Sequence, residues 1–274
     1  MHPDLKTIPR QPQVQLIGNG TVYDHEGLAE AVLKHPSHTT FHKTRVSDED
    51  EAKGITRFYR WHQDAALYDL APPKVTALYS ISVPQGPRQT CRYDDGTGDE
   101  LSVPLGTTAF VSGKTIFDIL PPELKSLAVR SKVKFAPHCF VWMAPAHAHS
   151  TGLKMETEGL ELPRDQLPSW EESKVVILPI VSVQNITAQS IHNDSLQLWK
   201  NPVTGDLHFE VAPCGAAELL VDALPAGAKR EGALHPDGAH ITDLKETREL
   251  LYKMQRPGIA PNVRQIASWS GVKY

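Results

Sequence analysis

Short apolar runs bounded by turn residues constrain the fold of this 274-residue chain most strongly. Val75–Val83 and Leu101–Phe110 alternate or run apolar, which is typical of strands in an all-β, double-layered barrel. Between them, Asp94–Gly98 contains two glycines that tolerate positive φ, so we expect a hairpin loop whose acidic side chains face solvent. The pattern predicts a mainly β chain.

Helical spacing of apolar residues marks the segments around these strands. It predicts helices, several of them bounded by proline, over residues 26–34, 114–119, 122–129 and 242–255. We therefore predict a mainly β protein with flanking helices (α+β). Ser131–Ala136 predicts a further strand, and residues 199–211 a hairpin with its turn at Pro202–Gly205. Residues 1–12 carry three prolines and no periodicity, which predicts a disordered lead-in.

The composition favours a small-molecule partner. Lys and Arg number 28 against 32 Asp and Glu, for a net charge of −4, and without a long basic run we expect no nucleic-acid partner. The most apolar run, Val175–Val183, is short and contains Pro179, so we expect a soluble, cytoplasmic protein with no membrane partner. Cys91, Cys139 and Cys214 lack zinc spacing, which predicts reduced, partly buried thiols.

His62 and Asp64 form the pair with the clearest chemical meaning. They lie two residues apart in an aromatic, strand-like run, and on an extended strand such residues point to one face. A non-haem Fe(II) site needs two histidines and one carboxylate, and this pair supplies two of the three. We expect both to face a concave pocket inside a barrel, with Tyr59, Trp61 and Gln63 alternating in orientation with them. The alternative is a strand-end histidine hydrogen-bonded to a neighbouring aspartate.

Two other groups of histidines invite a metal interpretation. His147 and His149 have metal-like spacing but lie in a small-residue, loop-like segment without a carboxylate at useful spacing. We expect them to have no acidic partner and to lie away from the Fe(II) pair. His35, His38 and His42 are irregularly spaced for a helix or strand face, which favours surface or capping roles.

The order of motifs along the chain resembles the taurine/α-ketoglutarate dioxygenase superfamily. That order is W-H-x-D, a Pro-Pro loop, a strand, G-x-T before an apolar strand, a short helix and L-P-P-E-L-K. More narrowly, the chain resembles the α-ketoglutarate-dependent xanthine dioxygenases of fungi from about residue 12 to about residue 262. The motifs that carry this resemblance are Ile17–Gly20, His25–Gly27, Leu33–His38, Thr40–Lys43, Arg57–Asp64 and Asn201–Gly205.

This resemblance implies a double-stranded β-helix (jelly-roll) domain over residues 13–262 and an enzyme that hydroxylates xanthine to uric acid. It implies Fe(II) held by His62 and Asp64, with α-ketoglutarate and O2 as co-substrates. Thr108, in Gly106–Thr108, would donate a hydrogen bond to the far carboxylate of α-ketoglutarate; the alternative is an ordinary β-branched strand residue.

The resemblance also implies roles for three charged residues. Lys34 would lie at the mouth of the active site, near the co-substrate or the purine, although it also fits a solvated lysine. Glu49 and Asp50 would face the substrate. The alternative is a helix N-terminus capped by Ser47, with acids in its first turn.

The family pattern further requires a second histidine and, about a dozen residues later, an arginine that clamps α-ketoglutarate. Residues 263–274, an atypical tail, contain no histidine. The resemblance thus implies a chain shortened at both ends, a jelly roll incomplete at its C-terminus and two iron ligands of three. We expect weak Fe(II) binding and negligible xanthine-dependent succinate formation from this chain alone. The alternatives are a non-catalytic binding module of the same fold, or a dioxygenase acting on another small organic acid such as a sulfonate.

Overall fold

The structure is a computed structural model. It describes residues 6–34, 41–62, 77–136, 146–157, 173, 175–182, 205–209, 215–263 and 266–267. The chain divides into two compact units, Met1–Thr40 and Phe41–Tyr274. Each unit is described separately below.

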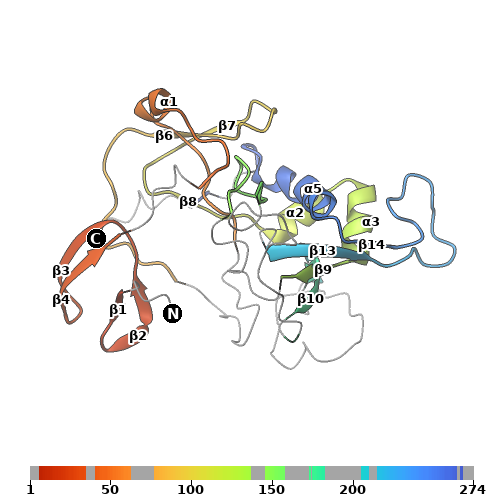
Figure 1. The fold of residues 1–274 in the computed structure, drawn as a ribbon, viewed down its shortest axis with the longest axis horizontal. Coiled ribbons are helices and arrows are strands. Elements are labelled where there is room, and N and C mark those ends of the chain that lie inside the picture. The colour runs from red at the N-terminus through yellow and green to blue at the C-terminus, as the bar shows by residue number, and fades with distance from the viewer. Residues whose placement is uncertain are drawn as a thin grey trace. The chain divides into compact units, whose positions relative to one another are not determined.

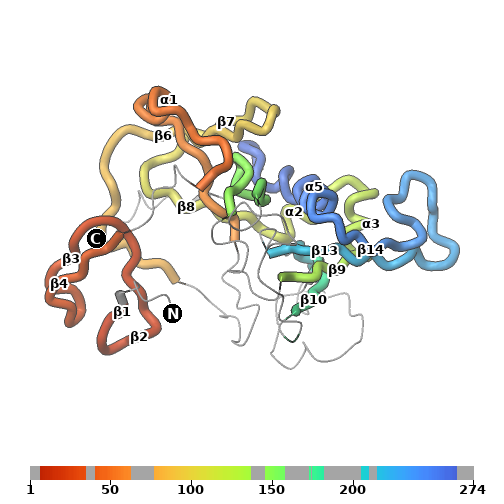
Figure 2. The backbone as a smooth tube through the Cα atoms, in the orientation of Figure 1, coloured from red at the N-terminus to blue at the C-terminus, as the bar shows by residue number. Residues whose placement is uncertain are grey.

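The N-terminal unit consists of two antiparallel hairpins, drawn in red and orange in Figures 1 and 2. Strand β1 (Lys6–Ile8) pairs with β2 (Gln11–Leu16), and β3 (Gly20–His25) pairs with β4 (Leu28–Leu33). Residues 6–12, for which the sequence predicts a disordered lead-in, therefore lie largely in strands.

The helix predicted over residues 26–34 is wrong, because Leu28–Leu33 is strand β4. Positive φ angles at Glu26 (50°) and Gly27 (91°) form the tight turn that returns the chain along β3. Pairing with β3 then satisfies the backbone groups that a helix would satisfy internally. A short apolar run fits either structure by spacing alone, so the turn decides between them.

The C-terminal unit begins with helix α1 (Asp48–Ala52) and a three-stranded sheet. Strand β5 (Ile55–Thr56) runs parallel to β6 (Gln89–Arg92), which pairs antiparallel with β7 (Glu100–Val103). Ser47 caps α1 as expected, since its hydroxyl accepts a hydrogen bond of 3.1 Å from the Asp50 amide. Residues 93–99 connect β6 to β7 and are called the 93–99 turn below.

The larger sheet carries the main hydrophobic core. Its antiparallel strand order is β10 (Val176–Pro179), β9 (Ser131–Phe135), β13 (Ala216–Val221) and β14 (Ala239–Ile241). Helices α2 (Gly113–Ile119), α3 (Pro122–Arg130) and α5 (Leu244–Gln255) lie beside it in Figure 1, and the 3-10 helix η6 (Arg256–Ile259) follows α5. Val133, Leu219 and Leu251 meet in one buried cluster with almost no exposed surface.

Two short strand pairs complete the described elements. Strand β8 (Thr108–Ala109) pairs with β15 (Ile266–Ala267), and β11 (Val181–Ser182) pairs with β12 (His208–Phe209). Of the predicted hairpin at 199–211, only residues 205–209 are described. Among the described residues, we find no helix with the length and apolar character needed to cross a membrane.

Of the remaining predicted elements, the helices and one strand are confirmed, and two strand predictions are not. Helices α2, α3 and α5 and strand β9 confirm the predictions for residues 114–119, 122–129, 242–255 and 131–136. The strand predicted over 75–83 is wrong for residues 77–83, which form no strand; residues 75 and 76 lie outside the described part. The strand predicted over 101–110 is split into β7 and β8 by a turn at Gly106, whose φ is 70°. Cys91 is a buried free thiol, as predicted, while Cys139 and Cys214 lie outside the described residues.

We predict that Leu251→Ala lowers the free energy of unfolding by about 2–5 kcal/mol, because it leaves a cavity in the main core. Leu78→Ala is the matched control. Leu78 is 43% exposed, so the same change should cost less than about 0.5 kcal/mol. Urea unfolding of both variants measures the difference, and equal losses would contradict the assignment of this core.

Candidate metal centre

The segment Arg57–His62 leads to the predicted metal ligands and is fixed at its start by an ion pair with a buried guanidinium. The Arg57 side chain is 4% exposed. Its Nε and Nη2 donate to Asp94 Oδ2 at 2.9 and 2.5 Å, and its Nη1 donates to the Thr44 carbonyl. A buried guanidinium that is paired in this way holds its position, because losing a partner leaves an uncompensated charge.

The middle of the segment is held through its backbone. His42 Nε2 donates to the Phe58 carbonyl at 2.7 Å. The Trp61 amide donates to the Gly152 carbonyl at 3.2 Å, and the indole Nε1 donates to the Thr151 carbonyl at 2.9 Å. His42 is only 3% exposed, so the predicted surface or capping role is wrong for it; His35 and His38 lie outside the described residues.

His62 follows Trp61 directly and is exposed. Its Nδ1 lies 3.0 Å from the Arg60 carbonyl oxygen. A carbonyl can only accept a hydrogen bond, so this contact places the proton on Nδ1 and the ring lone pair on Nε2. Metal-binding histidines typically donate their second ring N–H to a backbone carbonyl or carboxylate. The donor chemistry at His62 therefore fits a metal ligand that binds through Nε2.

The predicted surroundings of His62 and Asp64 need correction. Residues 57–62 form no strand, because their backbone bonds go to side chains and to turn carbonyls. Trp61 packs in an apolar cluster with Phe58 and Tyr93, whereas His62, predicted to face a concave pocket, is exposed. Gln63 and Asp64 lie outside the described residues, so convergence of His62 with Asp64 stays a prediction.

The predicted substrate-binding acids are both ion-paired on α1. Glu49 is exposed and contacts Lys53 Nζ at 2.6 Å, and Asp50 accepts from Arg92 Nη2 at 2.8 Å. The hydrogen bond from Arg92 lowers the pKa of Asp50, so its carboxyl is ionised at neutral pH. Arg92 also binds Asp94 Oδ1 at 2.6 Å. A continuous chain of ion pairs thus joins α1 to Arg57 and the His62 segment.

The predicted co-substrate residues lie in different units. Thr108 is partly buried on β8, opposite Ala267 of β15, so it is a strand residue as expected. Lys34 is exposed and follows β4 in the N-terminal unit. The role of each in binding α-ketoglutarate stays a prediction.

The expectation that His147 and His149 lack an acidic partner is wrong for His149. Its Nε2 lies 3.8 Å from Glu156 Oε1, and its Nδ1 lies 3.0 Å from Thr151 Oγ1. The turn that follows His149 also contacts Trp61, so this loop is not remote from the His62 segment. Burial, with a further contribution from Lys154, lowers the pKa of His149. Within the part of the chain that the structure describes, no three His, Cys, Asp or Glu residues gather to hold a metal ion.

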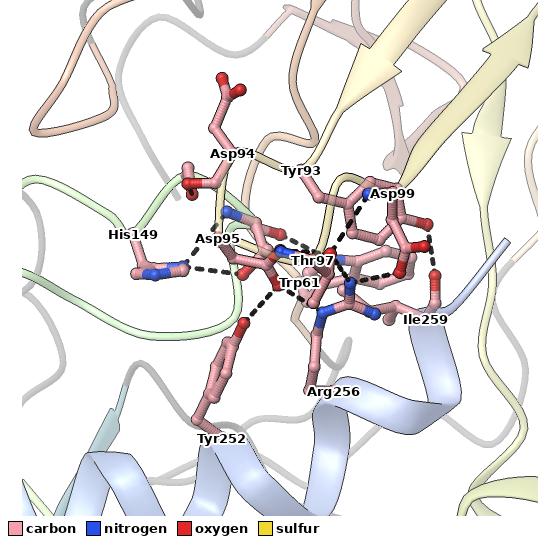
Figure 3. Close-up of polar contacts among 12 residues, drawn as sticks. Trp61, Tyr93, Asp94, Asp95, Thr97, Asp99, His149, Tyr252, Arg256 and Ile259 are labelled. Atoms are coloured by element: carbon pink, nitrogen blue, oxygen red, sulfur yellow. Dashed lines mark hydrogen bonds and ion pairs between the residues drawn. The ribbon is translucent and has the colours of Figure 1, made fainter.

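Asp95 centres a buried polar network that the sequence analysis missed (Figure 3). Its side chain is 2% exposed and accepts from Arg256 Nε, from the Tyr252 hydroxyl at 2.6 Å and from Thr97 Oγ1 at 2.6 Å. The predicted solvated turn is therefore wrong at Asp95. Burial opposes ionisation, but the donated hydrogen bonds outweigh it and hold the pKa of Asp95 well below its ordinary value.

Arg256 completes the connection between the 93–99 turn and the end of α5. Its Nη2 donates to Asp99 Oδ2 at 2.5 Å, and its guanidinium lies 4.6 Å from the centre of the Tyr93 ring. The Asp-x-Thr spacing of residues 95 and 97 is a local sign of a side-chain-closed turn. The arginine partner lies 161 residues away, so local spacing could not identify it.

A small apolar cavity lies beside this network, lined in part by Phe58, Trp61, Phe110 and Ile259. Its volume is about 20 Å³, enough for about one water molecule. It is too small for a purine, so it belongs to the packing around Trp61 and does not form the substrate site.

A mainly β fold with helices and a histidine oriented for metal binding fits the class of non-haem metal enzymes. Residues 15–217 match the family model described as taurine catabolism dioxygenase TauD, TfdA family. The chain belongs to this dioxygenase family. No solved structure matches the chain.

Several curated fungal proteins are similar over 98% of this chain. The α-ketoglutarate-dependent xanthine dioxygenase xan-1 of Neurospora crassa is 48% identical, with 57% of its own length covered. The xanthine dioxygenases xan1 of Schizosaccharomyces pombe and xanA of Emericella nidulans are 46% and 45% identical, with 59% and 64% covered. The chain thus spans about three-fifths of the length of these relatives.

We predict that Asp95→Asn lowers the free energy of unfolding by about 1–3 kcal/mol, because it removes the more buried of the two carboxylates that pair with the Arg256 guanidinium and leaves only Asp99. Asp118→Asn is the control, since its pair with Lys114 is half-exposed and worth about 0–1 kcal/mol. Urea unfolding at neutral pH measures both variants.

The pH dependence of stability gives a second measurement of the same pair. Because the folded pKa of Asp95 is lowered, its contribution is present above the unfolded value of about 3.9 and is lost as pH falls below it. The wild type should lose more stability than Asp95→Asn between about pH 5 and pH 2. Parallel curves would contradict a buried, ionised Asp95.

Proposed function

We propose that this protein is an Fe(II)- and α-ketoglutarate-dependent dioxygenase that hydroxylates xanthine to uric acid. Family membership and 45–48% identity to three fungal xanthine dioxygenases support the proposal. The observation that carries it is the orientation of His62, whose Nδ1 contact with the Arg60 carbonyl presents Nε2 as the metal-binding nitrogen. We extend the proposal to a jelly-roll core and a cytoplasmic location.

In this proposal His62 and Asp64 hold the iron, Thr108 donates a hydrogen bond to α-ketoglutarate, and Lys34 lies near the co-substrate. The bound iron, with α-ketoglutarate and O2, supplies the oxidising chemistry, in which α-ketoglutarate becomes succinate and CO2. The contribution of the protein is to orient the histidine and to position the purine relative to it.

Glu49 and Asp50 are suited to binding xanthine through its N–H groups. An ionised carboxylate only accepts hydrogen bonds, and a purine dione presents several N–H donors. The Asp50 carboxyl is kept ionised by Arg92, and the ion-pair chain through Asp94 joins it to the His62 segment. Helix α1 therefore carries hydrogen-bond acceptors for the purine, and ion pairs connect this helix to the segment that carries His62.

The test of the proposal is succinate formation that requires Fe(II), α-ketoglutarate and xanthine together. Because residues 263–274 contain no histidine, the assay compares two chains. One is the 274-residue chain, and the other carries the Neurospora relative's continuation after Asn262. We expect the second chain to form succinate with xanthine in preference to a sulfonate, and the first to form far less. Purine binding without succinate from either chain would instead support a binding module.

In the chain that carries the continuation, we predict that His62→Ala lowers succinate formation by at least 100-fold, because even a residue that only hydrogen-bonds to a metal ligand is typically worth about 10- to 100-fold. His147→Ala is the control and should retain wild-type activity. Full activity of His62→Ala, or loss of activity in His147→Ala, would contradict this assignment and favour a metal site in the 147–149 loop.

We also predict that Glu49→Gln raises the KM for xanthine about tenfold, the effect of losing one hydrogen bond to a charged acceptor. Glu51→Gln removes a carboxylate from the same helix and is the matched control. Equal KM values for the two variants would contradict a substrate role for Glu49.

A further inference from the structure

We propose that the Thr151–Gly152 turn is a positioning element for the metal ligand His62. The inference rests on the proposed iron site and adds residues to it that do not touch metal or substrate. Its basis is that this turn contacts the backbone on both sides of the carbonyl that orients the His62 ring.

Gly152 approaches the His62 segment more closely than any other residue type would allow. A Cβ placed on Gly152 would lie 1.9 Å from the Tyr59 carbonyl oxygen and 3.2 Å from that of Phe58. The φ of Gly152 is also 73°, a conformation that favours glycine. Any side chain at this position must push the Tyr59 backbone away.

Trp61 holds the other side of the same segment. Its amide and its indole nitrogen donate to the carbonyls of Gly152 and Thr151, so backbone and side chain are fixed to one turn. The indole ring packs 5.1 Å from the Phe58 ring within the cluster around Tyr93. These contacts remove freedom from the residue directly before His62.

The turn itself is well anchored. Thr151 is fully buried, its hydroxyl lies 3.0 Å from His149 Nδ1, and the Gly152 amide donates to the His149 carbonyl at 2.8 Å. A fixed turn transmits its position to whatever packs against it, because packed interiors deform little.

The Arg60 carbonyl lies between Tyr59 and Trp61, the two residues that the turn contacts. This carbonyl accepts from His62 Nδ1 and thereby sets the tautomer and the direction of Nε2. Displacing the backbone at Tyr59 or releasing Trp61 should therefore misdirect the metal-binding nitrogen without removing any ligand.

The experiment compares Gly152→Ala and Trp61→Phe with Gly232→Ala. Gly232 has nearly the same φ, 74°, but nothing lies within 4 Å of a Cβ placed on it, so this control carries the backbone strain without the contact. Trp61→Phe keeps an aromatic ring while removing the indole donor and part of the ring surface, and it decides the question if Gly152→Ala does not fold.

Three quantities are measured on each variant, made in the chain that carries the Neurospora relative's continuation after Asn262. They are the melting temperature, the Kd for Co(II) from its visible absorption, and the His62 tautomer in the metal-free protein by ¹⁵N NMR at about pH 8, where imidazole is neutral. We expect Gly152→Ala and Trp61→Phe to raise the Kd by about 10- to 100-fold and to lower the share of the Nδ1–H tautomer. Gly232→Ala should change neither quantity.

A fall in melting temperature with unchanged Kd and tautomer would overturn the proposal, since it shows a purely structural role. Equal effects of Gly152→Ala and Gly232→Ala on Kd would overturn it as well. A wild type that binds no Co(II) would contradict the iron site itself, and the tautomer of His62 would then decide the positioning by Thr151–Gly152 on its own.

Discussion

Two adjacent carboxylates in the 93–99 turn connect the His62 segment to the helix that packs in the main core. Asp94 binds Arg57, at the start of the segment that carries His62, while Asp95 binds Arg256 at the end of α5. Each pair contains a guanidinium with little exposed surface, so each depends on its partner to offset the cost of burying charge. Figure 3 shows the two side chains leaving the turn in different directions. One short turn thus connects the segment that carries His62, the proposed metal ligand, to a core helix.

This arrangement links the stability of the fold to the geometry of the site. Helix α5 is fixed to the large sheet by Leu251 and Met254, and Arg256 extends that fixed structure to the 93–99 turn. From the turn, Asp94 orients Arg57 and Arg92 together, and Arg92 reaches Asp50 on α1. The ligand segment and the helix proposed to bind the purine therefore share one support, which favours a fixed distance between them.

How far the sequence predicts this structure depends on the range of the interaction involved. Helices α2, α3 and α5 were predictable because apolar spacing and nearby prolines act within a few residues. Strand β4 was not, because its short apolar run fits two structures and the turn at Glu26–Gly27 decides between them. At the site, the His62-x-Asp64 motif is local, so the sequence alone could propose it, and the convergence of the two residues stays a prediction. The burial of Asp95 was missed because its partner Arg256 lies far along the chain. The hydrogen bonds of Trp61 were missed for the same reason, because their acceptors lie in the turn after His149.

The central claim is that His62 and Asp64 bind the metal together. A crystal structure of the protein with Mn(II) and α-ketoglutarate tests it most directly, since Mn(II) takes the same ligands without reacting with O2. The account predicts His62 Nε2 and an Asp64 carboxylate oxygen each at about 2.0–2.3 Å from the metal, with Nδ1 still bonded to the Arg60 carbonyl. A metal bound between His149 and Glu156, with His62 outside its coordination sphere, would contradict it.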